Sequence, residues 1–151
     1  MEFTRSEYLG LDLPWYAADA IGHLAVLMTG YGAIPKAVFA DQASYDLLDK
    51  YFEALPAQGE ARITDEQAQL QRRHNLNFDS FEKDARRGLF SYFHRGNSAS
   101  EPYELIAYPI TPLNFDQLPD GCRSAMKLLR FETVHFNKCH RFYVAEYFDC
   151  D

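Results

Sequence analysis

Three pairs of apolar, aromatic-rich segments constrain the fold of this chain more than any other feature of its sequence. The two members of each pair are separated by a short connection that contains glycine or asparagine, which is the pattern of a β-hairpin. The pairs are residues 15–19 with 23–28, 89–94 with 103–108, and 131–136 with 140–148. Because hairpins join antiparallel neighbours, we expect a mainly antiparallel sheet.

Helical periodicity appears between these pairs. From Asp41 to Leu55 the apolar residues recur at helical spacing and form one stripe. They are Ala43, Leu47, Leu48, Tyr51, Phe52 and Leu55. Thr64, with Gln67 three residues later, resembles a capping box and predicts a second, more polar helix to about His74 at the surface.

Two shorter helices are also expected. Asp79 with Glu82 resembles a further cap, and the apolar stripe after it stops near Gly88. After a proline-punctuated loop, residues 122–129 place Cys122, Ala125, Met126 and Leu129 on one helical face.

The order of hairpins and helices lacks the strand–helix alternation of a doubly wound sheet. We therefore predict an α+β fold in which helices pack on one face of an antiparallel sheet. No low-complexity segment or linker divides the sequence, and 151 residues is a common size for one domain, so a single domain over residues 1–151 is expected.

Composition excludes several classes of function. No segment approaches the roughly 18 to 20 apolar residues of a membrane span, and the N-terminus lacks the pattern of a secretory signal. Cys122, Cys139 and Cys150 match no disulfide framework and are expected as free thiols in the cytoplasm. A formal charge of −7 opposes nucleic-acid binding and favours a basic partner.

No catalytic motif is present, so we predict no enzyme, no cofactor and no metal. His135, Cys139 and His140, with Cys150 further on, are the local cluster of metal-ligand types, but their spacing matches no zinc motif, and a turn with a half-buried thiol is the alternative. The Gly30–Pro35 segment resembles a phosphate loop only superficially, because Lys36 follows proline and precedes alanine.

The candidate binding residues are acidic and aromatic. Asp46, Asp49 and Glu53 are spaced by three and four residues on the first helix, so they form a negative stripe. Such a stripe is either a solvated helix face or a docking surface for a basic protein. Tyr16 and Tyr31 are the aromatic residues expected to anchor a partner beside it.

Two alternatives to protein binding stay open. A small-ligand or enzymatic pocket would lie near the Gly30–Pro35 loop and involve His23, Tyr31 and Asp19. A structural subunit of a larger assembly would instead expose an apolar patch.

Residues 13–26, which read LPWYAADAIGHLAV, and residues 30–35, which read GYGAIP, resemble the N-terminal pattern of small bacterial proteins thought to be immunity proteins for polymorphic toxins. The resemblance covers about the first fifth of the chain and carries over no functional residue. It implies a cytoplasmic protein that binds and neutralises a cognate toxin. An inhibitor of a nuclease toxin would be acidic, because it would occupy a basic substrate site.

Overall fold

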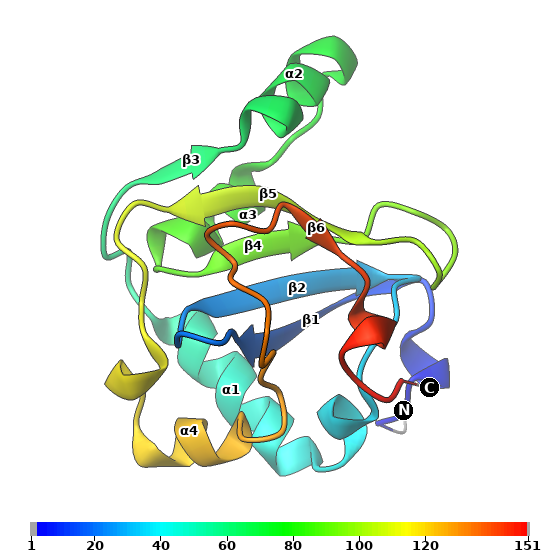
Figure 1. Ribbon diagram of the computed structural model, residues 1–151, viewed down its shortest axis with the longest axis vertical. Coiled ribbons are helices and arrows are strands. Elements are labelled where there is room, and N and C mark those ends of the chain that lie inside the picture. The colour runs from blue at the N-terminus through cyan, green and yellow to red at the C-terminus, as the bar shows by residue number, and fades with distance from the viewer. Residues whose placement is uncertain (1–2, 151) are drawn as a thin grey trace.

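A six-stranded, mostly antiparallel sheet organises the computed structural model, which describes residues 3–150 (Figure 1). The strands follow the order β1-β2-β4-β5-β3, and β6 also pairs with β5. The pairing of β2 with β4 is parallel, and the other pairings are antiparallel. The strands are β1 (Leu11–Ala18), β2 (Leu24–Gly30), β3 (Ala61–Ile63), β4 (Phe90–Phe93), β5 (Tyr103–Pro109) and β6 (Arg141–Phe142).

Four α-helices lie among the described residues, and the predicted α+β fold is confirmed. They are α1 (Gln42–Ala54), α2 (Asp65–His74), α3 (Asp79–Arg86) and α4 (Asp120–Ala125). The expected face over residues 122–129 extends past the end of α4, and Met126 and Leu129 are buried beyond it.

The first two predicted hairpins are present. β1 pairs with β2 through a turn in which Gly22 takes a φ of 94°, a conformation that favours glycine. β4 pairs with β5 across residues 94–102. In the loop after β2, a Cβ on Gly32 would lie 2.6 Å from the Tyr103 hydroxyl, so the absent side chain lets the loop lie against the sheet.

The third predicted hairpin is wrong. Residues 131–140 form an irregular segment, and only Arg141–Phe142 forms a strand, which pairs with Tyr103 and Glu104 of β5. The aromatic side chains that suggested two strands are buried for a different reason. Phe131, Phe136 and Phe142 pack against one another and over the sheet.

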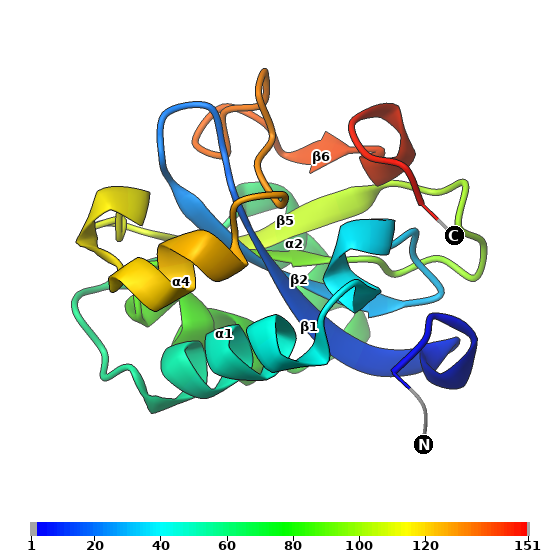
Figure 2. The ribbon, with the colours of Figure 1, turned by 90° about the horizontal axis from the view of Figure 1, so that it is seen from below.

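The two faces of the sheet are covered by different kinds of structure (Figure 2). Tyr16, Val26 and Ser91 are in register on one face. On this face Tyr16 stacks on Phe52 of α1, and the Ser91 hydroxyl donates a 2.9 Å hydrogen bond to the backbone of α3. The helices that pack directly on the sheet therefore share one face, as predicted, and α4 lies beside α1.

The opposite face is aromatic and is covered by the C-terminal segment, residues 131–148. Trp15, Tyr92 and Tyr103 are each at most 1% exposed. The ring centroids of Phe142 and Tyr92 lie 4.8 Å apart, and those of Phe148 and Trp15 lie 6.4 Å apart. Both pairs are edge to face. Irregular backbone, the two-residue strand β6 and one 3-10 turn thus do the covering that the sequence pattern assigned to a pair of strands.

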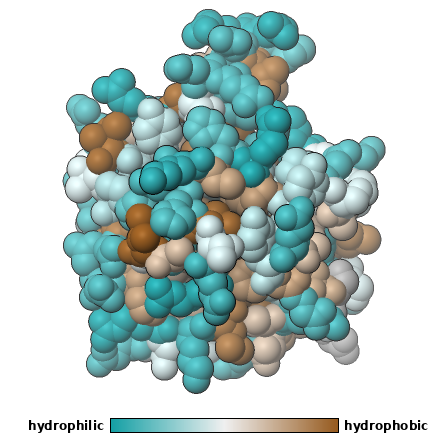
Figure 3. Space-filling model, in the orientation of Figure 1, coloured by the Kyte–Doolittle hydropathy of each residue, from teal (hydrophilic) through white to brown (hydrophobic). Residues whose placement is uncertain are grey.

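Helix α2 projects from the body of the molecule, and its surface is mostly hydrophilic in Figure 3. The Thr64 side chain caps it by accepting a hydrogen bond from the Gln67 amide, as predicted. The cap expected at Asp79 is wrong, because helix α3 already includes Asp79. The Asn77 side chain accepts the Asp79 amide instead, at 2.9 Å.

Candidate functional site

The predicted acidic stripe lies on α1. Asp41 begins the helix by accepting a hydrogen bond from the Ala43 amide, and Leu48 and Phe52 are buried against the sheet. The opposite side of the helix faces solvent. This amphipathic arrangement is what the apolar spacing of residues 43–55 predicted.

Asp46 and Glu53 are exposed and have no cationic partner within the described part of the chain. Among residues 3–150, no Lys, Arg or His nitrogen lies within 4.0 Å of either carboxylate. Lys50 is exposed on the same helix, and its ammonium also makes no ion pair at that distance within this part of the chain. The negative charge of Asp46 and Glu53 is therefore available to another molecule.

Asp49 is used inside the fold. It is half-buried and accepts a 2.7 Å hydrogen bond from the hydroxyl of Tyr16. Burial, followed by the hydrogen bond and the charge of Asp49, holds the pKa of the Tyr16 hydroxyl well above its ordinary value. This contact joins α1 to β1.

The two candidate tyrosines differ in position. Tyr16 is 4% exposed and stacks on Phe52 at 4.7 Å, so its ring belongs to the core. Tyr31 is 45% exposed at the end of β2. Of the five residues that the sequence nominated, Asp46, Glu53 and Tyr31 lie at the surface.

Leu47 is a surface residue that the sequence analysis placed on the apolar stripe of the first helix. It is 44% exposed on α1, where a Cβ added to Gly121 of α4 would lie 3.4 Å from it. Asp120 is also exposed at the start of α4 and pairs with Arg123. We call the surface formed by Asp46, Leu47, Glu53 and Asp120 the acidic face. The stripe has five residues in α1 and Leu55 just after it, a width that signals outward positions, and Ala43 and Leu47 are the exposed ones.

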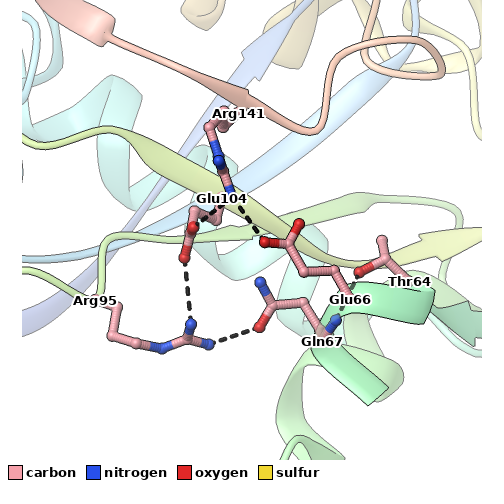
Figure 4. Close-up of polar contacts among 6 residues, drawn as sticks. All are labelled: Thr64, Glu66, Gln67, Arg95, Glu104 and Arg141. Carbon is pink, nitrogen blue, oxygen red and sulfur yellow. Dashed lines mark hydrogen bonds and ion pairs between the residues drawn. The ribbon is translucent and has the colours of Figure 1, made fainter. Parts of the chain in front are cut away.

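A group of charges on the other side of the molecule is paired within the fold (Figure 4). Glu104 of β5 accepts hydrogen bonds from Arg95 at 3.2 Å and from Arg141 at 3.0 Å. Arg141 also donates to Glu66 of α2 at 2.9 Å, and Arg95 donates to the side chain of Gln67 at 2.7 Å. We call these five residues the charge network. It attaches the N-terminal turn of α2 to the sheet.

The three residues of the alternative pocket do not come together. Asp19 and His23 lie at the β1–β2 turn, whereas Tyr31 follows β2 at its opposite end. Seven residues of extended strand separate the two groups, a span of roughly 20 Å. The predicted grouping of His23 and Asp19 with Tyr31 is therefore wrong, although Asp19 and His23 are neighbours.

Asp19 is a fully buried carboxylate held by backbone amides. One oxygen accepts from the amides of Ile21 at 3.0 Å and His23 at 2.9 Å, and the other accepts from the amide of Phe136 at 2.8 Å. Asp19 therefore ties the first hairpin turn to the C-terminal segment. Its second oxygen also lies 3.7 Å from Nδ1 of His23.

His23 lines a cleft of about 600 Å³, which also includes Phe90, Tyr108 and residues at the start of α2. The cleft does not include the Gly30–Pro35 loop, near which the alternative pocket was expected.

None of the three cysteines is in a disulfide within residues 3–150, and they lie at separate places. Cys122 is buried, and burial raises the pKa of its thiol, as it does for the half-buried Cys139. Across residues 3–150, no three His, Cys, Asp or Glu side chains form a group that could hold a metal ion. The described helices include none with the length and apolar character required to cross a membrane.

Comparison with protein-family models, curated protein sequences and solved structures gives no significant match. The resemblance of the N-terminal segment to immunity proteins therefore stays a prediction.

Proposed function

We propose that this domain works by binding a basic protein through the acidic face, and that the partner is a bacterial toxin that it neutralises in the cytoplasm. The observation that carries the proposal is that the carboxylates of Asp46 and Glu53 are exposed on one helix and have no cationic partner among residues 3–150. Carboxylates that the fold does not use can be desolvated and paired by a partner.

The acidic face has the elements of a protein-binding surface. Its unpaired carboxylates would steer a basic partner during diffusion and select its orientation. Leu47 adds an exposed apolar side chain close to α4, where a partner can exclude water. The arrangement supports recognition by charge with a small apolar centre.

Neutralisation of a toxin is supported by the acidity of the chain and by the resemblance of residues 13–35. The active site of a nuclease toxin is basic because it binds phosphates. An inhibitor that presents carboxylates on a rigid helix would compete with the nucleic acid for that site. A toxin of this class is the partner that we propose.

The test compares three tagged baits in lysate of the source organism at low and high salt, about 0.05 M and about 0.5 M. The baits are the unaltered chain, the double reversal Asp46→Lys/Glu53→Lys, and the control Glu60→Lys/Glu132→Lys. The control changes the net charge equally at exposed carboxylates outside the acidic face that are likewise unpaired among residues 3–150.

We expect a basic protein to bind the unaltered chain and the control at low salt, and to be lost from the α1 double variant. With the partner purified, the α1 double variant should associate about 10- to 100-fold more slowly than the control. Equal association by the two variants removes the acidic face as the binding site. A captured protein that does not impair growth when expressed alone removes the toxin assignment but leaves protein binding standing.

A further inference from the structure

The cleft beside His23 lies on the aromatic face of the sheet, away from α1. It is bounded by the start of β2, the first turn of α2 and residues 136–140. Its volume of about 600 Å³ lies within the usual range for small-molecule sites. Phe90, Leu105 and Phe136 lie beneath the cleft and are at most 3% exposed. The half-buried Tyr108 and Pro112 supply the apolar lining that a flat ring could contact.

The imidazole of His23 has a fixed orientation in this cleft. Its ring stacks on Phe90 at 5.3 Å with an interplanar angle of 29°. Nδ1 is buried, makes no hydrogen bond within the described chain and points toward the carboxylate of Asp19 at 3.7 Å. The His23 side chain is 18% exposed. Because Nδ1 is buried, the exposed part is the opposite edge of the ring, which carries Nε2 and faces the cleft.

The carboxylate behind the ring decides what Nε2 can do. In the tautomer that carries its proton on Nδ1, facing the carboxylate, the lone pair is on Nε2, and that nitrogen then accepts a hydrogen bond from a ligand. Asp19 is 0% exposed and already holds three backbone amides, so it cannot turn away from the ring. The imidazole orientation is therefore built into the fold.

The remaining polar lining is also rich in acceptors. Asp65 and Glu66 from the first turn of α2 face the cleft, and no Lys or Arg is among its lining residues. Arg141 neutralises Glu66 from outside the lining, whereas Asp65 has no ion pair among residues 3–150. Apart from the imidazoles of His23 and His140, phosphates and carboxylates would find no side chain of cationic type in this lining. A ligand with positive charge and N–H donors would find carboxylates and aromatic faces.

We propose that this cleft binds a planar organic cation with N–H donors, such as an amidine, a guanidine or an aminated heteroaromatic ring. The ring packs against Tyr108 and Pro112, one N–H donates to Nε2 of His23, and the charge lies toward Asp65. This site is separate from the acidic face, and the proposal does not depend on toxin binding.

Titration of the intact chain with benzamidine, followed by amide chemical shifts, tests the proposal. Benzoate is the matched ligand, because it has the same ring and an opposite charge. We expect saturable shifts at residues lining the cleft with benzamidine and none with benzoate. Equal binding of benzoate, or no saturation by about 10 mM benzamidine, overturns the proposal, since a matched fragment binds in the millimolar range or tighter.

Two variants locate the interaction. His23→Phe keeps the ring and its stacking on Phe90 but removes both nitrogens, and Asp65→Asn removes an exposed charge without touching the core. Each should weaken benzamidine about tenfold, the loss of one hydrogen bond or charge contact. His74→Phe, an exposed histidine at the other end of α2, should bind as the unaltered chain does. Unchanged affinity in Asp65→Asn, together with unchanged affinity in a folded His23→Phe, overturns the assignment.

Discussion

The acidic face and the charge network use the same kinds of side chain in opposite ways. In the charge network, Glu104 and Glu66 are paired with arginines from other parts of the chain. On the acidic face, Asp46 and Glu53 have no such partners within residues 3–150. Charges that meet inside the network stabilise the position of α2, whereas charges left on α1 cost the fold little and stay available. The difference distinguishes carboxylates that hold structure from carboxylates that can bind a partner.

The largest effect is expected from Arg95→Ala in the charge network. Gln67 is 1% exposed, and the substitution leaves its side-chain oxygen without the donor that it now has. The free energy of unfolding should fall by about 1 to 3 kcal/mol, the cost of an unsatisfied buried acceptor. Urea denaturation measures this loss, and hydrogen exchange should show α2 losing protection first. Arg72→Ala, an exposed arginine on the same helix, should have little effect. Equal losses in the two variants would show that the network does not hold α2.

Tyr16→Phe tests the one carboxylate of the acidic stripe that the fold uses. The ring stays stacked on Phe52, but the hydrogen bond to Asp49 is lost, at a cost of about 1 kcal/mol at neutral pH. Tyr31→Phe, at an exposed ring, is the matched control and should be nearly neutral. A Tyr16→Phe variant as stable as the control would contradict a structural role for Asp49.

The same variant has a pH signature. Because burial and Asp49 raise the pKa of the Tyr16 hydroxyl, the folded protein keeps this proton where the unfolded chain releases it. Its contribution is fully present below the ordinary tyrosine pKa, about 10, and is lost as the pH rises above it. Above that pH the free energy of unfolding should fall less steeply for Tyr16→Phe than for the unaltered chain. The two slopes should differ by about 1.4 kcal/mol per pH unit. Chemical denaturation between neutral pH and pH 11 measures both slopes.

The smallest effect is expected from neutralising α1 with Asp46→Asn/Glu53→Gln. These carboxylates make no ion pair within the part of the chain that the structure describes, so stability should change by less than about 0.5 kcal/mol. Glu104→Gln removes the carboxylate shared by Arg95 and Arg141 and should cost about 1 kcal/mol or more. A larger loss on α1 than at Glu104 would break the distinction between the two regions.

Local patterns were sufficient to predict α1 and the first two hairpins. The periodicity of residues 41–55 and the glycine at the first turn depend on neighbours in sequence, and both elements lie close to their expected positions. The capping pattern at Thr64 worked for the same reason. The cap predicted at Asp79 failed because the helix begins one residue earlier than expected, and the amide of Glu82 donates to the carbonyl of Phe78.

Features that depend on distant residues were not accessible from the sequence. The parallel pairing of β2 with β4 joins segments that three helices separate. The alternation of side chains in residues 140–148 suggests a strand. The same pattern arises when the aromatic side chains belong to a segment that covers a sheet, so the sequence does not distinguish the two cases. Similarly, Tyr16 lies on a strand buried on both faces, so alternation gave no sign that its ring packs on α1.

For the candidate sites, the sequence identified residues but not their relations. Asp46 and Glu53 were placed correctly on one helical side, yet the participation of Asp49 in the core depends on Tyr16, 33 residues away. Asp19 and His23 were paired with Tyr31 because all three border the first hairpin. Opposite ends of a strand are close in sequence and far apart in space, so proximity along the chain was misleading.

The covering of the aromatic face by residues 131–148 has a consequence for synthesis on the ribosome. The sheet strands that carry Trp15, Tyr92 and Tyr103 emerge before the segment that buries them. Until that segment has left the ribosome, the nascent chain presents a sheet with an uncovered aromatic surface, the kind of surface that chaperones bind. Asp19 can bind the amide of Phe136 only after the 117 residues that follow it have been synthesised, so this contact between the first hairpin and the covering segment forms late.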